Sequence, residues 1–78
     1  MEIEPILAKI WSKRHELNYS QEYMAMLLEM KQANYNKIEN GKVEMTLSML
    51  FKITNILELD YEELFMFFNQ KSRITSNL

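Results

Sequence analysis

The first third of the chain places its apolar residues at the three- and four-residue spacing of an amphipathic α-helix. Pro5 suits the first turn of such a helix, because a residue there needs no N–H donor. Asn18 tolerates the left-handed conformation that commonly ends a helix. We therefore predict a helix from Glu4 to Leu17, whose stripe consists of Ile3, Ile6, Leu7, Ile10, Trp11, Arg14 and Leu17.

Two shorter helices are predicted next. Ser20 is a favourable N-cap, and the helix that it opens extends through Leu28. Glu29 and Met30 form a tight turn, and a third helix covers residues 32–40. Gly41 ends this helix, because glycine adopts positive φ without steric strain.

The remaining pattern predicts a fourth and a fifth helix. Thr46 caps the fourth, and its expected inner face is Leu47, Leu50, Phe51, Thr54 and Leu57. Asp60 followed by Glu63 resembles a capping box, and the nearly continuous apolar run 64–68 follows it. We predict one domain over residues 1–69 and a polar, frayed tail over residues 70–78.

Composition agrees with a single small all-α domain. The 78 residues include one Gly, one Pro and no Cys. The absence of Cys excludes disulfides and thiolate metal sites. The N-terminus carries acidic residues where a signal peptide has basic ones, and no apolar run approaches the length of a membrane span. We expect a soluble, cytoplasmic protein that binds no membrane.

The net charge of −2 neither supports nor excludes an anionic partner, because the local charge distribution decides such binding. Acidic residues predominate in the stretch 43–70, where Lys52 is the only basic residue. The stretch 31–42 instead has three lysines and one glutamate. The third predicted helix therefore lies in the more basic part of the chain.

From about Ile6 to Phe65 the chain resembles the phage repressor and Cro type of helix-turn-helix domain, also called Xre-like. The resemblance rests on Ser20-Gln21-Glu22, Ala25, Ile38-Glu39-Asn40-Gly41-Lys42, Leu57-Glu58-Leu59-Asp60 and Glu63-Leu64. It implies a five-helix, lambda-repressor-like fold whose second and third helices form the helix-turn-helix. It also implies a transcriptional regulator, expected to be a repressor, that binds double-stranded DNA.

The resemblance also pairs two charged residues. At about 100° per residue, Glu39 lies on the same side of its helix as Tyr35 and Ile38. An inward carboxylate needs a partner to offset its desolvation. The resemblance places Arg14 opposite, and Arg can bind a carboxylate with two hydrogen bonds. We expect a structural Arg14–Glu39 salt bridge that fixes the third helix against the first.

The resemblance assigns DNA contacts to the third helix and its flanks. In this fold the N-terminal part of that helix meets base edges in the major groove. The residues expected to contact bases are Gln32, Ala33, Asn36 and Lys37. The residues expected to contact phosphates are Gln21, Asn40 and Lys42.

Four departures from the family pattern predict modest DNA affinity. Lys31 stands where a capping Ser or Thr is common. Glu29 and Glu58 replace frequent glycines, and each costs on the order of 1 kcal/mol if the position needs positive φ. Glu44 adds a negative charge in a loop expected near phosphate.

The chain has more apolar residues than one small core requires. Trp11 and either Phe65 or Phe68 are expected to pack together and thicken the core. The remaining excess predicts an exposed patch, which commonly marks an interface. The candidate interface residues for a homodimer or a protein partner are Tyr23, Met26, Leu27, Met66, Phe67 and Phe68.

Two other function classes compete with DNA binding. A protein-interaction or antitoxin-like module on the same fold is the serious alternative, since the acidic second half and the apolar patch favour it. An enzyme is not expected, because His15 is the only His and no glycine-rich phosphate loop is present. Glu62 and Glu63 are adjacent on a helix and do not face each other. We expect no metal, no cofactor and no small-molecule substrate.

Overall fold

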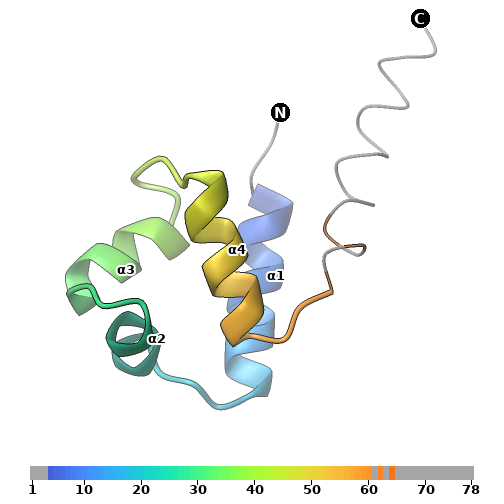
Figure 1. The fold of residues 1–78 in the computed structure, drawn as a ribbon, viewed down its shortest axis with the longest axis horizontal. Coiled ribbons are helices and arrows are strands. Elements are labelled where there is room, and N and C mark those ends of the chain that lie inside the picture. Colours follow the sequence, from blue (N-terminus) through green and yellow to red (C-terminus); the bar gives the residue numbers. More distant parts are fainter. Residues whose placement is uncertain (1–3, 61, 63, 65–78) are drawn as a thin grey trace, which may run out of the picture.

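The computed structural model describes residues 4–60, 62 and 64, and within these residues it contains helices and no strand. The helices are α1 (Glu4–Glu16), α2 (Gln21–Leu27), α3 (Gln32–Glu39) and α4 (Leu47–Ile56). Figure 1 shows α2 and α3 side by side, joined by a short turn. Helix α3 also contacts α1, and α2 contacts α4. The prediction of an all-α fold is confirmed for the described part of the chain.

Side-chain caps open two of the helices. The hydroxyl of Ser20 accepts a hydrogen bond from the backbone N–H of Tyr23 at 2.9 Å, at the start of α2. Thr46 accepts one from Met49 N–H at 3.1 Å, at the start of α4. Lys31 precedes α3 and makes no side-chain cap. The predicted weak start of α3 is therefore present, since one orphan N–H group lacks this partner.

All four helices end in the same way. After each, one residue takes positive φ: Asn18, Glu29, Gly41 and Glu58, with φ of 60°, 56°, 71° and 56°. The residue that follows donates its N–H five residues back at 2.9–3.0 Å, as in Tyr19 N to Arg14 O and Met30 N to Ala25 O. These bonds define a Schellman motif, which satisfies carbonyls that the helix leaves unpaired.

Glycine is present at one of these four ends. A Cβ on Gly41 would lie 3.1 Å from Leu7 Cδ1, so the residue is constrained by packing as well as by φ. Asn at position 18 tolerates the left-handed region through local side-chain hydrogen bonding. Glu29 and Glu58 lack that tolerance, and their positive φ confirms the condition on which the expected strain depends.

The core lies between the four helices. It is made of residues from every helix and from the segment after α4: Ile6, Leu7, Ile10, Met24, Ala25, Tyr35, Ile38, Leu50, Ile53, Leu57, Leu59 and Leu64. Burial of this apolar surface is the main stabilising contribution to such a small domain.

The predicted inner face of α4 is wrong at two positions. Leu47 is 64% exposed and Phe51 is 40% exposed. The buried stripe instead includes Ile53, which lies three residues after Leu50 and four before Leu57. Helix α4 has apolar residues on more than one face, so helical spacing alone fits two stripes, and packing selects the one that contains Ile53.

The fifth predicted helix lies mostly outside the described residues. Its beginning is described: Glu62 and Leu64 are helical, and Leu64 is buried. Asp60 Oδ1 accepts a hydrogen bond from Glu62 N at 2.9 Å. The partner Glu63 of the predicted capping box, the apolar run after Leu64 and the boundary at residue 69 lie outside the described residues.

Trp11 does not lie in the core of the described residues. It is 51% exposed, and its ring lies 3.8 Å from the ring of His15, one turn later on α1. The predicted packing partners Phe65 and Phe68 lie outside the described residues.

We predict that Glu29→Gly and Glu58→Gly each raise the free energy of unfolding by about 0.5–1 kcal/mol. Each change removes the left-handed strain of an L-residue, partly offset by the greater entropy of unfolded glycine. Urea unfolding at neutral pH measures the difference. Lys52→Gly inside α4 is the control and should lower stability by about 1 kcal/mol. Destabilisation by both Glu→Gly variants would contradict the assignment of strain.

Candidate nucleic-acid interface

The unit formed by α2, the turn and α3 places one helix at the surface. Ala25 is fully buried in the middle of α2, the helix that packs most closely on α3. Its small side chain permits the close approach of the two helices. Met30 follows the positive-φ residue Glu29 and is partly buried against the core. The turn is therefore held by a buried side chain before it, at Ala25, and by a partly buried one after it, at Met30.

Helix α3 has a buried and an exposed face. Tyr35, Ile38 and Glu39 are buried. Of the residues expected to contact bases, Gln32, Ala33 and Lys37 are exposed and Asn36 is half-buried. The structure thus brings the predicted base-contacting residues to one surface, with Asn36 lying deepest.

A buried ion pair joins α3 to α1. Arg14 Nη2 lies 2.8 Å from Glu39 Oε1, and Arg14 Nε lies 2.9 Å from Glu39 Oε2. Arg14 Nη1 also donates to the carbonyl oxygen of Tyr19 at 2.9 Å, and Tyr35 Oη donates to Glu39 Oε2 at 2.6 Å. The structure brings the predicted pair together in the two-bond geometry that favours Arg over Lys.

Burial and hydrogen bonding act against each other on Glu39. Burial raises the pKa of its carboxyl group, but hydrogen bonds from Arg14 and Tyr35 more than offset this, so the pKa lies below its usual value. The hydrogen bond to Glu39 raises the pKa of Arg14. Burial, followed by the bond to Glu39, raises the pKa of Tyr35 well above its usual value. The pair is therefore ionised and Tyr35 is neutral at pH 7.

The carboxylate of Glu39 is also connected to α2, through hydrogen bonds made by amide side chains. Gln21 Nε2 donates to Glu39 Oε1 at 3.4 Å, and Asn36 Nδ2 donates to Gln21 Oε1 at 3.1 Å. The sequence reasoning missed these two bonds. The spacing of Asn36 three residues before Glu39 indicates that both lie on neighbouring parts of α3. The approach of Gln21 from another helix has no such sequence signal.

The residues expected to contact phosphates lie after α3, at Asn40 and Lys42, and at the start of α2, at Gln21. Lys42 and Asn40 are exposed, and Asn40 Nδ2 donates to the carbonyl oxygen of Asn36 at 2.9 Å. Gln21 is half-buried and already bonded to two side chains. Glu44 is exposed two residues after Lys42. Lys42 is thus the best-presented positive charge at this end of α3.

An apolar patch covers the outer face of α2. Met26 is 62% exposed, and Leu27 and Tyr23 are also exposed. The ring of Tyr23 lies 4.8 Å from that of Tyr19. The other candidate interface residues, Met66, Phe67 and Phe68, lie outside the described residues. Helix α2 is therefore apolar on its outer face as well as at Met24 and Ala25.

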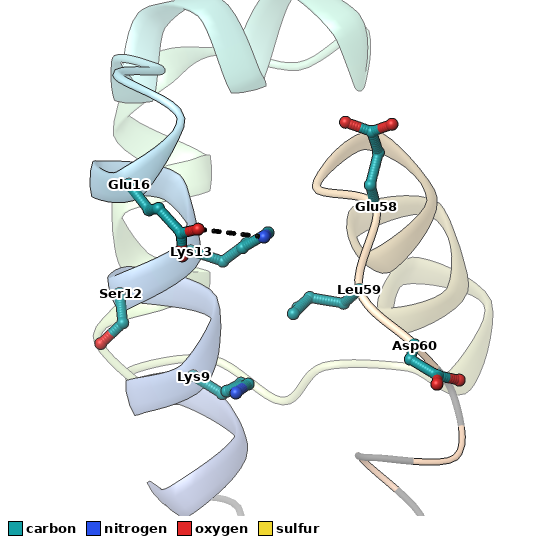
Figure 2. A pocket seen from close by; sticks show the side chains of 7 residues that line it. All are labelled: Lys9, Ser12, Lys13, Glu16, Glu58, Leu59 and Asp60. Atoms are coloured by element: carbon teal, nitrogen blue, oxygen red, sulfur yellow. Dashed lines mark hydrogen bonds and ion pairs between the residues drawn. The ribbon is translucent and has the colours of Figure 1, made fainter.

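Figure 2 shows the residues that line a hollow between α1 and the segment after α4. The volume of this hollow is about 200 Å³. It is lined by Lys9, Ser12, Lys13, Glu16, Glu58, Leu59 and Asp60. Lys13 Nζ pairs with Glu16 Oε1 at 3.4 Å. Because the lining includes three carboxylates and two ammonium groups, it is unfavourable for a phosphate ligand. This hollow is a poorer nucleic-acid site than the surface of α3.

The described residues offer neither a metal site nor a membrane-spanning helix. Among these residues, no group of three or more His, Cys, Asp and Glu side chains is placed to hold a metal ion. No helix in that part of the chain is long and apolar enough to cross a membrane.

A model of the helix-turn-helix family matches residues 12–64, about two thirds of the chain. This range includes all of α2, α3 and α4 and the last part of α1. Searches of curated proteins and of solved structures found no match.

We predict that Glu39→Gln lowers the free energy of unfolding by about 3 kcal/mol at pH 7, because it leaves Arg14 buried without its counter-charge. Folding lowers the pKa of Glu39 from its ordinary value of 4.5. The stabilising contribution of the carboxylate is therefore fully present above pH 4.5 and is lost as the pH falls through the pKa of the folded state. The difference between variant and wild type should therefore shrink below pH 4.5. Urea unfolding across this pH range measures it.

The double variant Arg14→Met/Glu39→Met is the control for desolvation. It should lower the free energy of unfolding by less than the sum of the two single changes, because the double variant leaves no buried charge unpaired. A stability loss of Glu39→Gln that is independent of pH would contradict the assigned role of the ionised carboxylate.

Proposed function

The chain belongs to the Xre/Cro-like helix-turn-helix family of DNA-binding transcription regulators, and on that premise we propose a specific mode of action. The protein binds double-stranded DNA as a repressor and reads the major groove with α3. This role places it in the compartment that contains the DNA, which we expect to be the cytoplasm. The family is one of DNA-binding domains and not of enzymes.

The observation that carries this proposal is an exposed polar face on an anchored helix. Gln32, Ala33 and Lys37 are exposed, while Tyr35, Ile38 and Glu39 hold the opposite face in the core. Gln and Asn can make two hydrogen bonds to adenine, Lys donates to guanine acceptors, and the methyl of Ala33 suits a thymine methyl. A helix that is already fixed in the core presents these groups without a cost for ordering the backbone at the moment of binding.

Local charge supports the same surface despite the net charge of −2. Lys31, Lys37 and Lys42 are exposed around α3, whereas Glu39 is buried and neutralised by Arg14. The charges that face solvent along this stretch are therefore positive. Lys42, together with Asn40 and Gln21, would set the register on the phosphates.

We predict that selection from a random duplex library at about 0.15 M salt enriches an inverted repeat. Its half-sites would lie about one DNA turn apart, as expected for a dimer of this fold. Salt at this level screens weak, non-specific phosphate attraction, so enrichment reports base recognition. No enrichment by the folded protein would contradict sequence-specific binding.

Two variants separate base reading from phosphate contact in the selected duplex. Gln32→Ala should cost about 1–3 kcal/mol and relax preference at one base position. Lys42→Ala should weaken binding uniformly over all sequences and reduce the salt slope by about 1. Equal, sequence-independent effects of both variants would argue against base reading by Gln32.

A second function is favoured by the apolar outer face of α2. Met26, Leu27 and Tyr23 are exposed together, and such a patch commonly marks a protein interface. The chain would then act as an interaction module, antitoxin-like in kind, whose main partner is a protein. The same patch, with the apolar residues after Leu64, would alternatively join two copies of the chain into the homodimer that the inverted repeat requires.

We predict that the wild-type chain sediments as a dimer at tens of micromolar and that Leu27→Glu sediments as a monomer. A buried glutamate at the interface would cost more than the contact contributes. Glu22→Gln, an exposed change on the same helix, is the control and should leave the dimer intact. Wild-type monomer at this concentration would contradict the homodimer, and a dimer that survives Leu27→Glu would exclude this patch as its interface.

A further inference from the structure

The buried ion pair and the base-reading surface are joined by two amide side chains. Gln21 donates through Nε2 to Glu39 Oε1 at 3.4 Å, and its Oε1 accepts from Asn36 Nδ2 at 3.1 Å. These bonds link α1, α2 and α3, since Glu39 is also bonded to Arg14. Asn36 is the half-buried member of the predicted base-contacting set.

The chemistry of the carboxylate fixes the direction of both bonds. An ionised carboxylate has no hydrogen to donate, so any amide bonded to it must present its nitrogen. Gln21 therefore turns Nε2 toward Glu39 and its oxygen toward Asn36. Asn36 must then present its own nitrogen to Gln21. A free amide, by contrast, is able to rotate and exchange its donor and acceptor.

We propose that Gln21 is a positioning residue that fixes the orientation of the Asn36 amide for base reading. This inference rests on the proposed function and goes beyond it, because it assigns Gln21 a role in sequence preference. The phosphate contact expected for Gln21 would affect affinity alone.

The fixed orientation has a consequence for the base that Asn36 prefers. The two branches of an amide diverge, so Oδ1 of Asn36 lies away from Gln21, and within the described residues it accepts no hydrogen bond. One hydrogen on Nδ2 also remains. An acceptor beside a donor matches the N6–H and N7 of adenine, whereas guanine presents two acceptors on this edge. We therefore assign Asn36 to an adenine, and guanine is rejected because the one remaining Nδ2 hydrogen can serve only one of its two acceptors while Oδ1 repels the other.

The first test uses Gln21→Met, which has a similar length and no hydrogen-bonding amide. The Arg14 and Tyr35 bonds to Glu39 do not involve the changed side chain, so the fold should persist. Library selection and competition binding should show that the preference for adenine over guanine at one position falls about five- to tenfold. Preferences at the other positions should stay unchanged.

Three further variants make this result specific. Asn36→Ala should remove the preference at the same base position, and adding Gln21→Met to it should cause no further loss there. Gln32→Met, which changes an exposed amide on α3, should alter a different position only. A loss of affinity in Gln21→Met that is uniform over all sequences, with the adenine preference at this position unchanged, would overturn the proposal and leave Gln21 as a phosphate contact only.

The second test needs no DNA. The two Nδ2 protons of Asn36 should be well separated in the proton NMR spectrum of the wild type, because one is bonded to Gln21. They should approach the values of a free amide in Gln21→Met, while the Arg14 Nε proton keeps its position. An Asn36 amide that is unchanged by Gln21→Met would overturn the proposal.

The two tests also separate this inference from the proposed function. Should the wild type select no sequence while its Asn36 amide responds to Gln21→Met, base reading is wrong and the bonded chain of amides remains. Should the wild type select a sequence with an intact preference in Gln21→Met, DNA binding stands and the positioning role is wrong.

Discussion

The orientation of α3 depends on one buried carboxylate. Glu39 receives hydrogen bonds from Arg14 on α1, Tyr35 on its own helix and Gln21 on α2. A carboxylate buried without these donors would protonate or destabilise the fold, so the three helices are stable together only in the arrangement that supplies them. The apolar core alone would tolerate sliding of α3 along its neighbours. The directional bonds at Glu39 restrict that freedom.

The helix ends add a second constraint, at a cost in stability. Four Schellman motifs reverse the chain within a few residues and allow helices of only seven to thirteen residues to pack closely. Two of them use Glu29 and Glu58 at positive φ. In a domain of this size the resulting strain is a substantial fraction of the total stability. The structure therefore combines a tightly specified arrangement with a small margin against unfolding.

Much of this arrangement is predictable from sequence where the signal is local. Ser20, Thr46 and Gly41 mark helix boundaries through their own chemistry, and they do so in the structure. The buried stripe of α4 is not predictable in this way, because Leu47 and Phe51 satisfy helical spacing as well as Ile53 does. The contact between Gln21 and Asn36 is unpredictable for a different reason: it depends on how α2 crosses α3, a tertiary distance that no spacing along the chain encodes.

The network at Glu39 links stability to recognition. Because Asn36 is bonded to Gln21 and Gln21 to Glu39, the deepest side chain on the reading face is connected to the groups that hold α3 in the core. Its amide is therefore ordered before DNA arrives, and little rotamer entropy is lost on binding. Gln32 and Lys37 are exposed and, within the described residues, have no such fixed bonds. Sequence discrimination per contact should accordingly be greatest at Asn36, even though it exposes less surface than they do.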